Sequence, residues 1–206
     1  MGVVTVSRQY GAGGQRVAPA VAEALGFRFV DREIVEQAAA QVGVDPEVAQ
    51  HLDERVPALI EKVGLALAAA SPEFGLTAPP RADDRTLAES VERVILSLAA
   101  TGGYVILGRG GQAILHDRAD ACHVQLVGAL DDRVRRVVRS QGVSANEARD
   151  LCRRVDADRA AYVRRFHGFD INDPLLYDVV LNTSRLGIDG AAAAAVTAAR
   201  ERLGLS

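Results

Sequence analysis

The stretch that decides the fold is VVTVSRQYGAGGQRVAPAVAEALG, which occupies residues 3–26. Its first four residues are mostly β-branched and predict a short buried strand. Apolar residues at helical spacing begin at Val17, and Gly26 is a typical helix stop, so a helix is expected after the glycines. A strand, a glycine-rich turn and a helix in this order predict a site where backbone N–H groups bind an anion, usually phosphate.

Two kinds of phosphate loop compete for this stretch. Gly11 and Gly13, with Asp31 further on, imitate the dinucleotide-binding fingerprint, in which the acid would bind the ribose hydroxyls. The third glycine of that fingerprint is Arg16 here, however. The next predicted strand after Val30 also comes about 70 mostly helical residues later, which suits the mononucleotide P-loop better.

When the chain is aligned with the P-loop pattern G-x-x-x-x-G-K-[ST], Gly13 matches the second glycine, and Arg8 occupies the position of the first glycine. Gly14 stands at the lysine and Gln15 follows it, so the loop is a phosphate cradle without its cation. The chain has 23 arginines and a single lysine, Lys62, which is far from the loop in sequence. Any cation at the phosphates must therefore be an arginine, which can bind phosphate through two parallel hydrogen bonds.

The rest of the chain alternates between helical and strand patterns, which predicts crossover connections and a parallel sheet in a three-layer α/β domain. We expect helices over residues 31 to about 70 and 85–100, a capping box at 144–147, and strands over 27–30, 104–107, 123–127 and 177–181.

Composition narrows the function further. A net charge of −3 argues against a nucleic-acid binder that works by bulk charge. Cys122 and Cys152 form neither a disulfide framework nor a zinc site. No leader opens the sequence and no apolar run approaches a membrane span, so a cytoplasmic protein is the default expectation.

Four separated motifs resemble the cytidylate kinase-like family, a branch beside the bacterial cytidylate kinases. They are SRQYGAGG at residues 7–14, FVDREI at 29–34, GRGG at 108–111, and DPLLYDVVLNT at 173–183. The resemblance implies a P-loop nucleoside monophosphate kinase-like fold with a five-stranded parallel sheet. It also implies one domain over residues 1–206, with its core at 1–30, 85–141 and 175–206, a helical monophosphate-binding insertion at 31–84, and a lid at 142–174.

The resemblance also implies ATP with Mg²⁺, and a phosphate acceptor, CMP or dCMP in the first instance. The metal ligands are not identified, since neither a Ser nor a Thr follows the loop. The implied site residues are Ser7, Gly11, Ala12, Gly13, Gly14, Gln15 and Arg16 for ATP, Asp31, Arg32 and Arg109 for the acceptor, and Arg154 and Arg159 of the lid for catalysis. Where the chain departs from the family by lacking the lysine, our hypothesis is that Arg8 or Arg16, which flank the cradle, supplies the catalytic cation.

Two further readings stay open at this point. The loss of the lysine is also what a non-catalytic nucleotide-binding or regulatory module would show, and the fold also suits a kinase of another small acceptor. Small-molecule nucleotides are the expected partners, without nucleic acid or membrane, and a homodimer is one alternative for the assembly.

Several polar residues have a plain structural interpretation beside a functional one. His123 lies in a strand pattern and is expected to be structural, and Asn182 either approaches the donor base or caps a turn. Arg149 could pair with Glu147 or Asp150 on its own helix. The arginines at 133, 135, 136 and 139 stand off the apolar face of their helix and are expected on a solvated surface.

Overall fold

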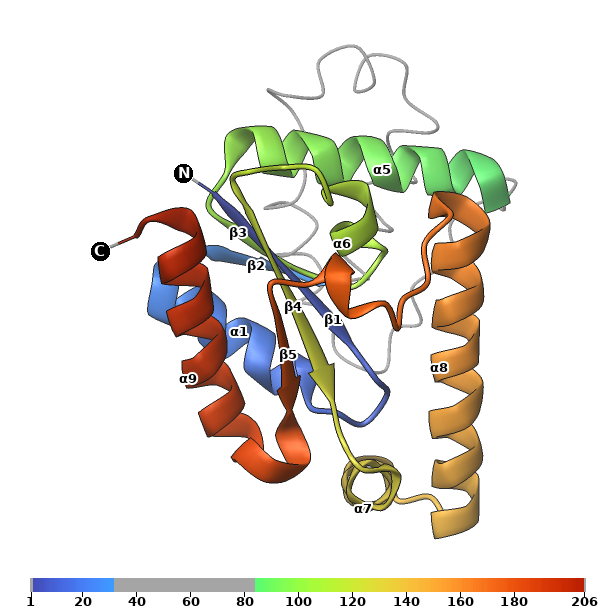
Figure 1. The fold of residues 1–206 in the computed structure, drawn as a ribbon. Helices are drawn as coiled ribbons and strands as arrows, with labels where there is room; N and C mark the ends of the chain where they lie inside the picture. The colour runs from blue at the N-terminus through green and yellow to red at the C-terminus, as the bar shows by residue number, and fades with distance from the viewer. Residues whose placement is uncertain (1, 32–83, 206) are drawn as a thin grey trace, which may run out of the picture.

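The computed structural model describes residues 2–31 and 84–205, which form one parallel sheet with helices on both faces (Figure 1). The five strands lie in the order β2-β3-β1-β4-β5, and all four neighbouring pairs are parallel. The predicted fold class is therefore confirmed. The strands are β1 (Val3–Arg8), β2 (Arg28–Val30), β3 (Tyr104–Leu107), β4 (Ala121–Val127) and β5 (Val179–Asn182).

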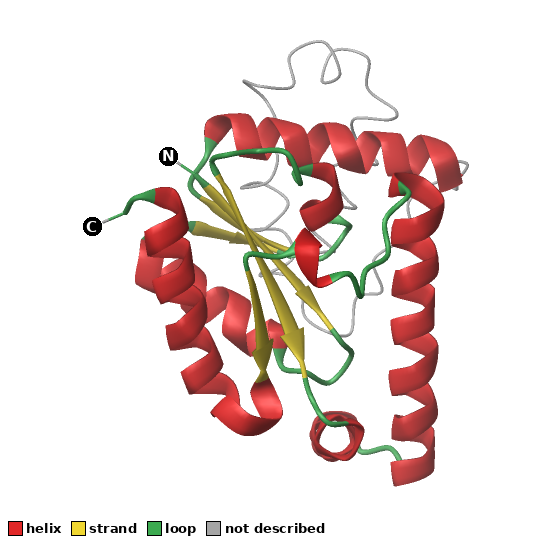
Figure 2. Ribbon diagram, in the orientation of Figure 1, coloured by secondary structure: helices red, strands yellow, loops and turns green. Residues whose placement is uncertain are grey.

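The helices form a layer on each side of this sheet (Figure 2). Helices α1 and α9 pack against one face in a core that includes Val4, Val6 and Leu107, and α5 packs against the other face over Val3 and Ile106. The described helices are α1 (Gly14–Leu25), α5 (Asp84–Thr101), α6 (Gly111–Ile114), α7 (Leu130–Gln141), α8 (Ala145–His167), η1 (Pro174–Leu176) and α9 (Thr183–Leu203).

Burial on both faces of the sheet explains why the sequences of β1 and β3 are nearly continuous apolar runs and do not alternate between apolar and polar residues. Val3, Val4 and Val6 are each at most 1% exposed, although successive side chains point to opposite faces. Because the strands are parallel, the carboxyl ends of β1 and β3 open onto the same edge of the sheet, where α8 stands alongside (Figure 1). Open α/β sheets bind their ligands at this edge.

Most of the helix ends predicted from local sequence patterns agree with the structure, among the residues that it describes. The capping box is present, because Ser144 accepts a hydrogen bond from the Glu147 amide while the Glu147 carboxylate accepts one from the Ser144 amide. The last strand begins two residues later than predicted. Tyr177 ends the 3-10 helix, and the Asp178 carboxylate accepts a hydrogen bond from the His123 amide before β5 starts.

His123 is structural, as predicted, and it gives the fold a pH dependence. Its ring is buried, with Nε2 3.2 Å from the Leu115 carbonyl and Nδ1 2.7 Å from the Thr5 hydroxyl. A carbonyl can only accept, so Nε2 carries the proton and the Thr5 hydroxyl donates to Nδ1. Burial lowers the pKa of this imidazole below its ordinary value of 6.5, although Asp178 opposes the shift.

The unfolded chain therefore binds a proton at His123 more readily than the folded chain does. We expect the free energy of unfolding to fall as the pH drops below 6.5, by at most about 1.4 kcal/mol per pH unit for this one group. Urea titrations between pH 7.5 and 5 measure this loss. A His123→Gln variant should be less stable at pH 7.5 and lose less on acidification; an identical pH dependence in the variant would contradict the assignment.

The described part of the chain, residues 2–31 and 84–205, contains no helix with the length and apolar character needed to cross a membrane. The predicted helices between residues 32 and about 70, and most of the predicted insertion, lie outside the described residues.

Candidate functional site

The loop between β1 and α1 has the geometry of a phosphate cradle. Gly13 precedes α1 with φ 91°, and no side chain caps the first turn of the helix. The Ala12 amide bonds to the Gln9 carbonyl, which closes a turn. The described residues supply no acceptor for the amides of Gly11, Gly13, Gly14 and Gln15. These four N–H groups at a helix start are available to an anion.

The carbonyl groups of the same loop are held from outside by arginines. Arg159 donates to the Arg8 carbonyl at 2.8 Å, Arg133 to the Tyr10 carbonyl at 3.0 Å, and Arg136 to the Gly11 carbonyl at 3.2 Å. The prediction that Arg133 and Arg136 lie on a solvated surface is wrong. Arg133 is only 7% exposed, because α7 packs across the loop and turns both side chains toward it.

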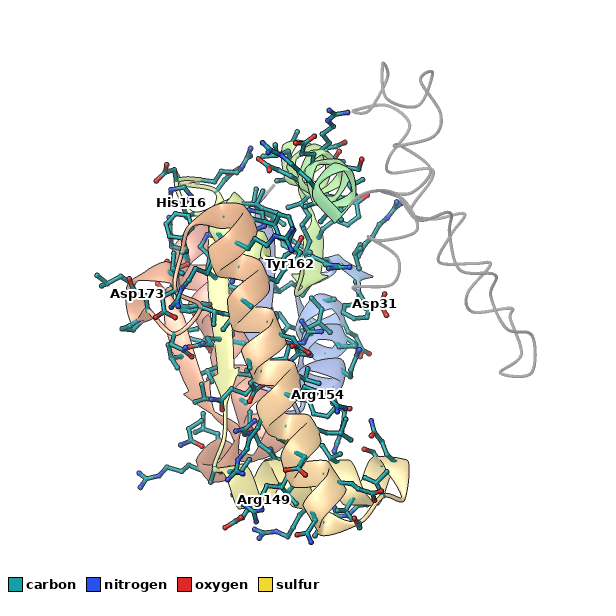
Figure 3. All side chains as sticks on the ribbon, turned by 90° about the vertical axis from the view of Figure 1, so that its right-hand side faces the viewer. Asp31, His116, Arg149, Arg154, Tyr162 and Asp173 are labelled. Atoms are coloured by element: carbon teal, nitrogen blue, oxygen red, sulfur yellow. The ribbon has the colours of Figure 1, made fainter. Side chains whose placement is uncertain are left out.

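Helix α8, which falls within the predicted lid, is attached to the loop at a second point. The Asp156 carboxylate accepts a hydrogen bond from the Tyr10 amide at 2.7 Å and forms an ion pair with Arg133 at 2.6 Å. Near its N-terminal end, Arg149 pairs with Asp131 of α7 at 2.7 Å, and not with Glu147 or Asp150. Figure 3 shows Arg149, Arg154 and Tyr162 in succession along this helix.

The second glycine-rich loop follows β3 and adopts a rare backbone conformation. Gly108, Arg109 and Gly110 have φ angles of 86°, 55° and 72°, all in the left-handed region. Arg109 is the one residue other than glycine with a positive φ in the described part of the chain. Such strain in a long side chain persists where the surrounding structure fixes it, typically at functional sites.

Arg8 runs between the two loops. A Cβ added to Gly14 would lie 2.9 Å from the Arg8 Cγ, and one added to Gly108 would overlap the Arg8 guanidinium. Gly14 occupies the lysine position of the P-loop pattern, so the side chain of Arg8 already fills the space where a lysine would start. The guanidinium then extends to the loop that carries Arg109.

A cavity of about 310 Å³ lies between the end of β1, the Gly108–Gly110 loop and α8. Three of its lining residues, Arg8, Arg109 and Arg159, are cationic, and Asp158 is the one acid that lines it. An excess of guanidinium groups around an enclosed space favours a phosphorylated ligand. The remaining lining residues are Ser7, Gly108, Gly110, Gln112, Val155, Tyr162, Val163 and Ile171.

Gln112 and Tyr162 line the cavity and present buried polar atoms that lie within hydrogen-bond distance and angle of no atom of the described residues. Gln112 is 2% exposed and its Nε2 lacks a hydrogen bond, as does the Tyr162 hydroxyl. Burial raises the pKa of the Tyr162 phenol, and the Arg109 cation above its ring, 5.3 Å from the centroid, opposes that rise. A buried donor without a partner costs about 1–3 kcal/mol, so both atoms are suited to a ligand.

The structure thus brings Ser7, Arg8, Arg109 and Arg159 around one cavity, beside the loop of residues 11–15. It does not bring Arg16 or Arg154 there: both are exposed, and neither side chain forms an ion pair or hydrogen bond with a described residue. Arg32 lies outside the described residues. Asp31 is at the same edge of the sheet, just after β2 (Figure 3).

Sequence reasoning missed Gln112 and Tyr162 as cavity residues. A glutamine just after GRGG was a usable signal, because the segment directly follows a strand at the ligand edge. Of the two alternatives for Asn182, the structural one holds, since its side chain caps α9 through the Ser184 amide.

The sequence model of the cytidylate kinase-like family matches residues 3–185. The chain belongs to this family. The match includes both glycine-rich loops, the cavity between them and all of α8.

Similar proteins agree with this family assignment. The chain is 28% identical to the cytidylate kinase of Ignicoccus hospitalis, over 91% of its own length and 92% of the relative. It is also 28% identical to the cytidylate kinase of Pyrobaculum aerophilum, over 93% and 89% of the two chains. A crystal structure of an uncharacterized protein from Eubacterium ventriosum superposes with a TM-score of 0.72 at 18% identity, covering 97% and 98% of the two chains, and it shares the fold.

This member of the cytidylate kinase-like family therefore has a kinase fold with an altered phosphate loop. Kinases of this kind in general use ATP with Mg²⁺. The four available loop amides fit the phosphates of a nucleotide.

Proposed function

We propose that this chain transfers the γ-phosphate of ATP to CMP, dCMP or a related nucleoside monophosphate. One observation carries the proposal: an arginine-lined cavity lies between the end of β1, where the phosphate loop begins, the strained Gly108–Gly110 loop and α8. The triphosphate would bind the amides of Gly11, Gly13, Gly14 and Gln15, and the acceptor would bind in the cavity with its phosphate on Arg109. Phosphoryl transfer depends mainly on positioning and charge neutralisation, which this arrangement can supply.

Arg8 replaces the missing P-loop lysine in this proposal. Its side chain passes over the lysine position and reaches the acceptor loop, so its guanidinium lies between the donor and acceptor sites. Arg16, the other candidate in the sequence, is exposed on α1 and its side chain contacts neither loop through a hydrogen bond. The geometry therefore favours Arg8, with Arg159 as the cation supplied by the lid.

The described residues do not by themselves form a metal cage. They hold no group of three or more His, Cys, Asp or Glu side chains that could bind an ion. Mg²⁺ usually enters such sites with the phosphates, keeping several waters and only one or two carboxylates. Asp158 is the carboxylate on the cavity wall that fits this role, and the metal would help neutralise charge on the transferred phosphate.

Glycine in place of the P-loop lysine, at Gly14, favours a second candidate function, a module that binds nucleotide without transferring phosphate. The two are separated by measuring ADP release from ATP and Mg²⁺ with CMP, dCMP, UMP, AMP and non-nucleotide acceptors. Turnover with the cytidine nucleotides supports the proposal. Thermal stabilisation by ATP without turnover on any acceptor supports the module, and turnover with only a non-nucleotide acceptor indicates a different kinase.

Gln112 gives a test of the acceptor site. Gln112→Leu keeps the buried volume but removes the Nε2 donor from the cavity, and we expect the KM for the monophosphate to rise by about tenfold. The KM for ATP should change little, because the loop amides are untouched. Steady-state kinetics with each substrate varied in turn measure both values; an equal rise in the two would place the ligand contact elsewhere. Gln125→Leu is the matched control, since Gln125 donates to the Ile171 carbonyl behind the cavity.

A further inference from the structure

We propose that Arg133 and Asp156, supported by Arg136, form an arginine clamp that aims the Gly11 amide of the phosphate loop at the nucleotide without touching it. Arg159 also holds the loop backbone, but it lines the cavity and is not counted as part of the clamp. This inference rests on the proposed nucleotide site for its functional consequence. The clamp residues come from α7 and α8, and each is bonded to the backbone of residues 10–11.

The stereochemistry of the peptide bond links the outside of the loop to its inside. In a trans peptide the carbonyl of one residue and the N–H of the next point in opposite directions. Arg133 binds the Tyr10 carbonyl from outside, and this orients the Gly11 N–H toward the opposite side of the loop. The Gly11 amide is one of those without an acceptor among the described residues. Holding the carbonyl therefore fixes the direction of a phosphate donor.

Arg133 is fixed in turn by two other bonds. Its Nε donates to the Gly128 carbonyl at 3.0 Å, and Nη1 lies 2.6 Å from Asp156, whose other oxygen accepts from the Tyr10 amide. Both backbone polar groups of Tyr10 are thus bound to one partly buried ion pair. The bonds to the Gly128 and Tyr10 carbonyls use two different nitrogens of the guanidinium, Nε and Nη1, whereas the donors of a lysine all lie on one nitrogen.

Arg136 holds the next peptide, whose N–H is that of Ala12 and is already bonded to the Gln9 carbonyl, so Arg136 supports the shape of the loop and aims no donor itself. It bridges the Gly11 carbonyl and the Thr183 carbonyl, and its Nη1 also lies 3.0 Å from the Thr183 hydroxyl. The close approach of α7 also explains the glycine, because a Cβ on Gly11 would lie 2.7 Å from the Arg133 carbonyl and φ there is 76°.

The test compares Arg133→Met and Asp156→Ala with Arg149→Met as a matched control. Arg149 forms the other ion pair between α7 and α8 but contacts none of the loop, so its loss weakens helix docking alone. Calorimetry measures the Kd for ADP and for CMP separately, and hydrogen exchange measures the amides of residues 8–15. For both clamp variants we expect the Kd for ADP to rise about tenfold, the Kd for CMP to change less than about twofold, and the loop amides to exchange faster.

The proposal is overturned if the clamp variants bind ADP as tightly as the native chain, if ADP and CMP weaken equally, or if Arg149→Met has the same effect. Arg133→Lys should retain the charge yet recover only part of the ADP affinity; full recovery would contradict the required geometry. If the clamp variants do not fold, Arg136→Met provides the same measurements at the neighbouring peptide. If the native chain binds neither ADP nor ATP, the proposed function fails, and unchanged loop exchange in Asp156→Ala would separately refute the clamp.

Discussion

Replacing Arg8 with glycine is expected to lower turnover by about 10³-fold, the smallest effect typical of an arginine that neutralises a transferring phosphate. The reason is the course of the Arg8 side chain, whose Cγ lies beside Gly14 at the lysine position and whose guanidinium lies beside Gly108, in the loop proposed to bind the acceptor. ADP should still bind, because the loop amides and the clamp remain. Steady-state kinetics with ATP and CMP, together with ADP calorimetry, measure the two effects.

The same variant allows a rescue. With Arg8 removed, Gly14→Lys no longer meets the Arg8 Cγ, and the double variant has both glycines and the lysine of the standard P-loop pattern. We expect it to recover a large part of the turnover that Arg8→Gly loses, whereas Gly14→Lys alone should be poorly active because two cations compete for one space. Arg16→Met is the control. A large loss of turnover in Arg16→Met, with little loss in Arg8→Gly, would show that Arg16 supplies the cation and that the assignment to Arg8 is wrong.

Arg109 is expected to show the second largest effect, and its backbone conformation separates function from stability. Arg109→Ala and Arg109→Gly should both raise the KM for the monophosphate by about 100-fold, since each removes a charge-assisted bond to its phosphate. Their stabilities should differ, because a residue with a side chain is strained at φ 55° and glycine is not.

We therefore expect Arg109→Gly to be more stable than Arg109→Ala by roughly 1 kcal/mol, as measured by urea unfolding. Equal stabilities would indicate that the left-handed conformation costs nothing in this loop. A KM near the native value in both variants would show that the acceptor phosphate binds elsewhere.

Much of the fold could be predicted because its signals are local. The β-branched run at residues 3–6, the stop at Gly26 and the capping box at Ser144 each act within a few residues of the chain. The phosphate loop was predictable for the same reason, since its placement between a strand and a helix is a local pattern.

The surroundings of the loop could not be predicted, because its contacts join residues far apart in the sequence. Arg133 and Arg136 follow the polar face of an amphipathic helix, and nothing near them shows that loop carbonyls lie against that face. The partner of Arg133 on α8 is 23 positions away, and its carbonyl acceptor at Tyr10 is 123 positions away. Helical periodicity identifies which face of a helix is polar. It does not show whether that face contacts water or the buried backbone of another segment.

The attachment of α8 to the phosphate loop also limits how substrates can enter and products leave. The helix is bonded to the loop backbone through Asp156 and Arg159, which lie near its middle. Moving it outward as a rigid body would break these bonds together, at a cost of about 0.5–1.5 kcal/mol for each bond. Because the bonds are made to the loop backbone, we expect α8 and the loop after β1 to move as one unit whenever the cavity beside them opens.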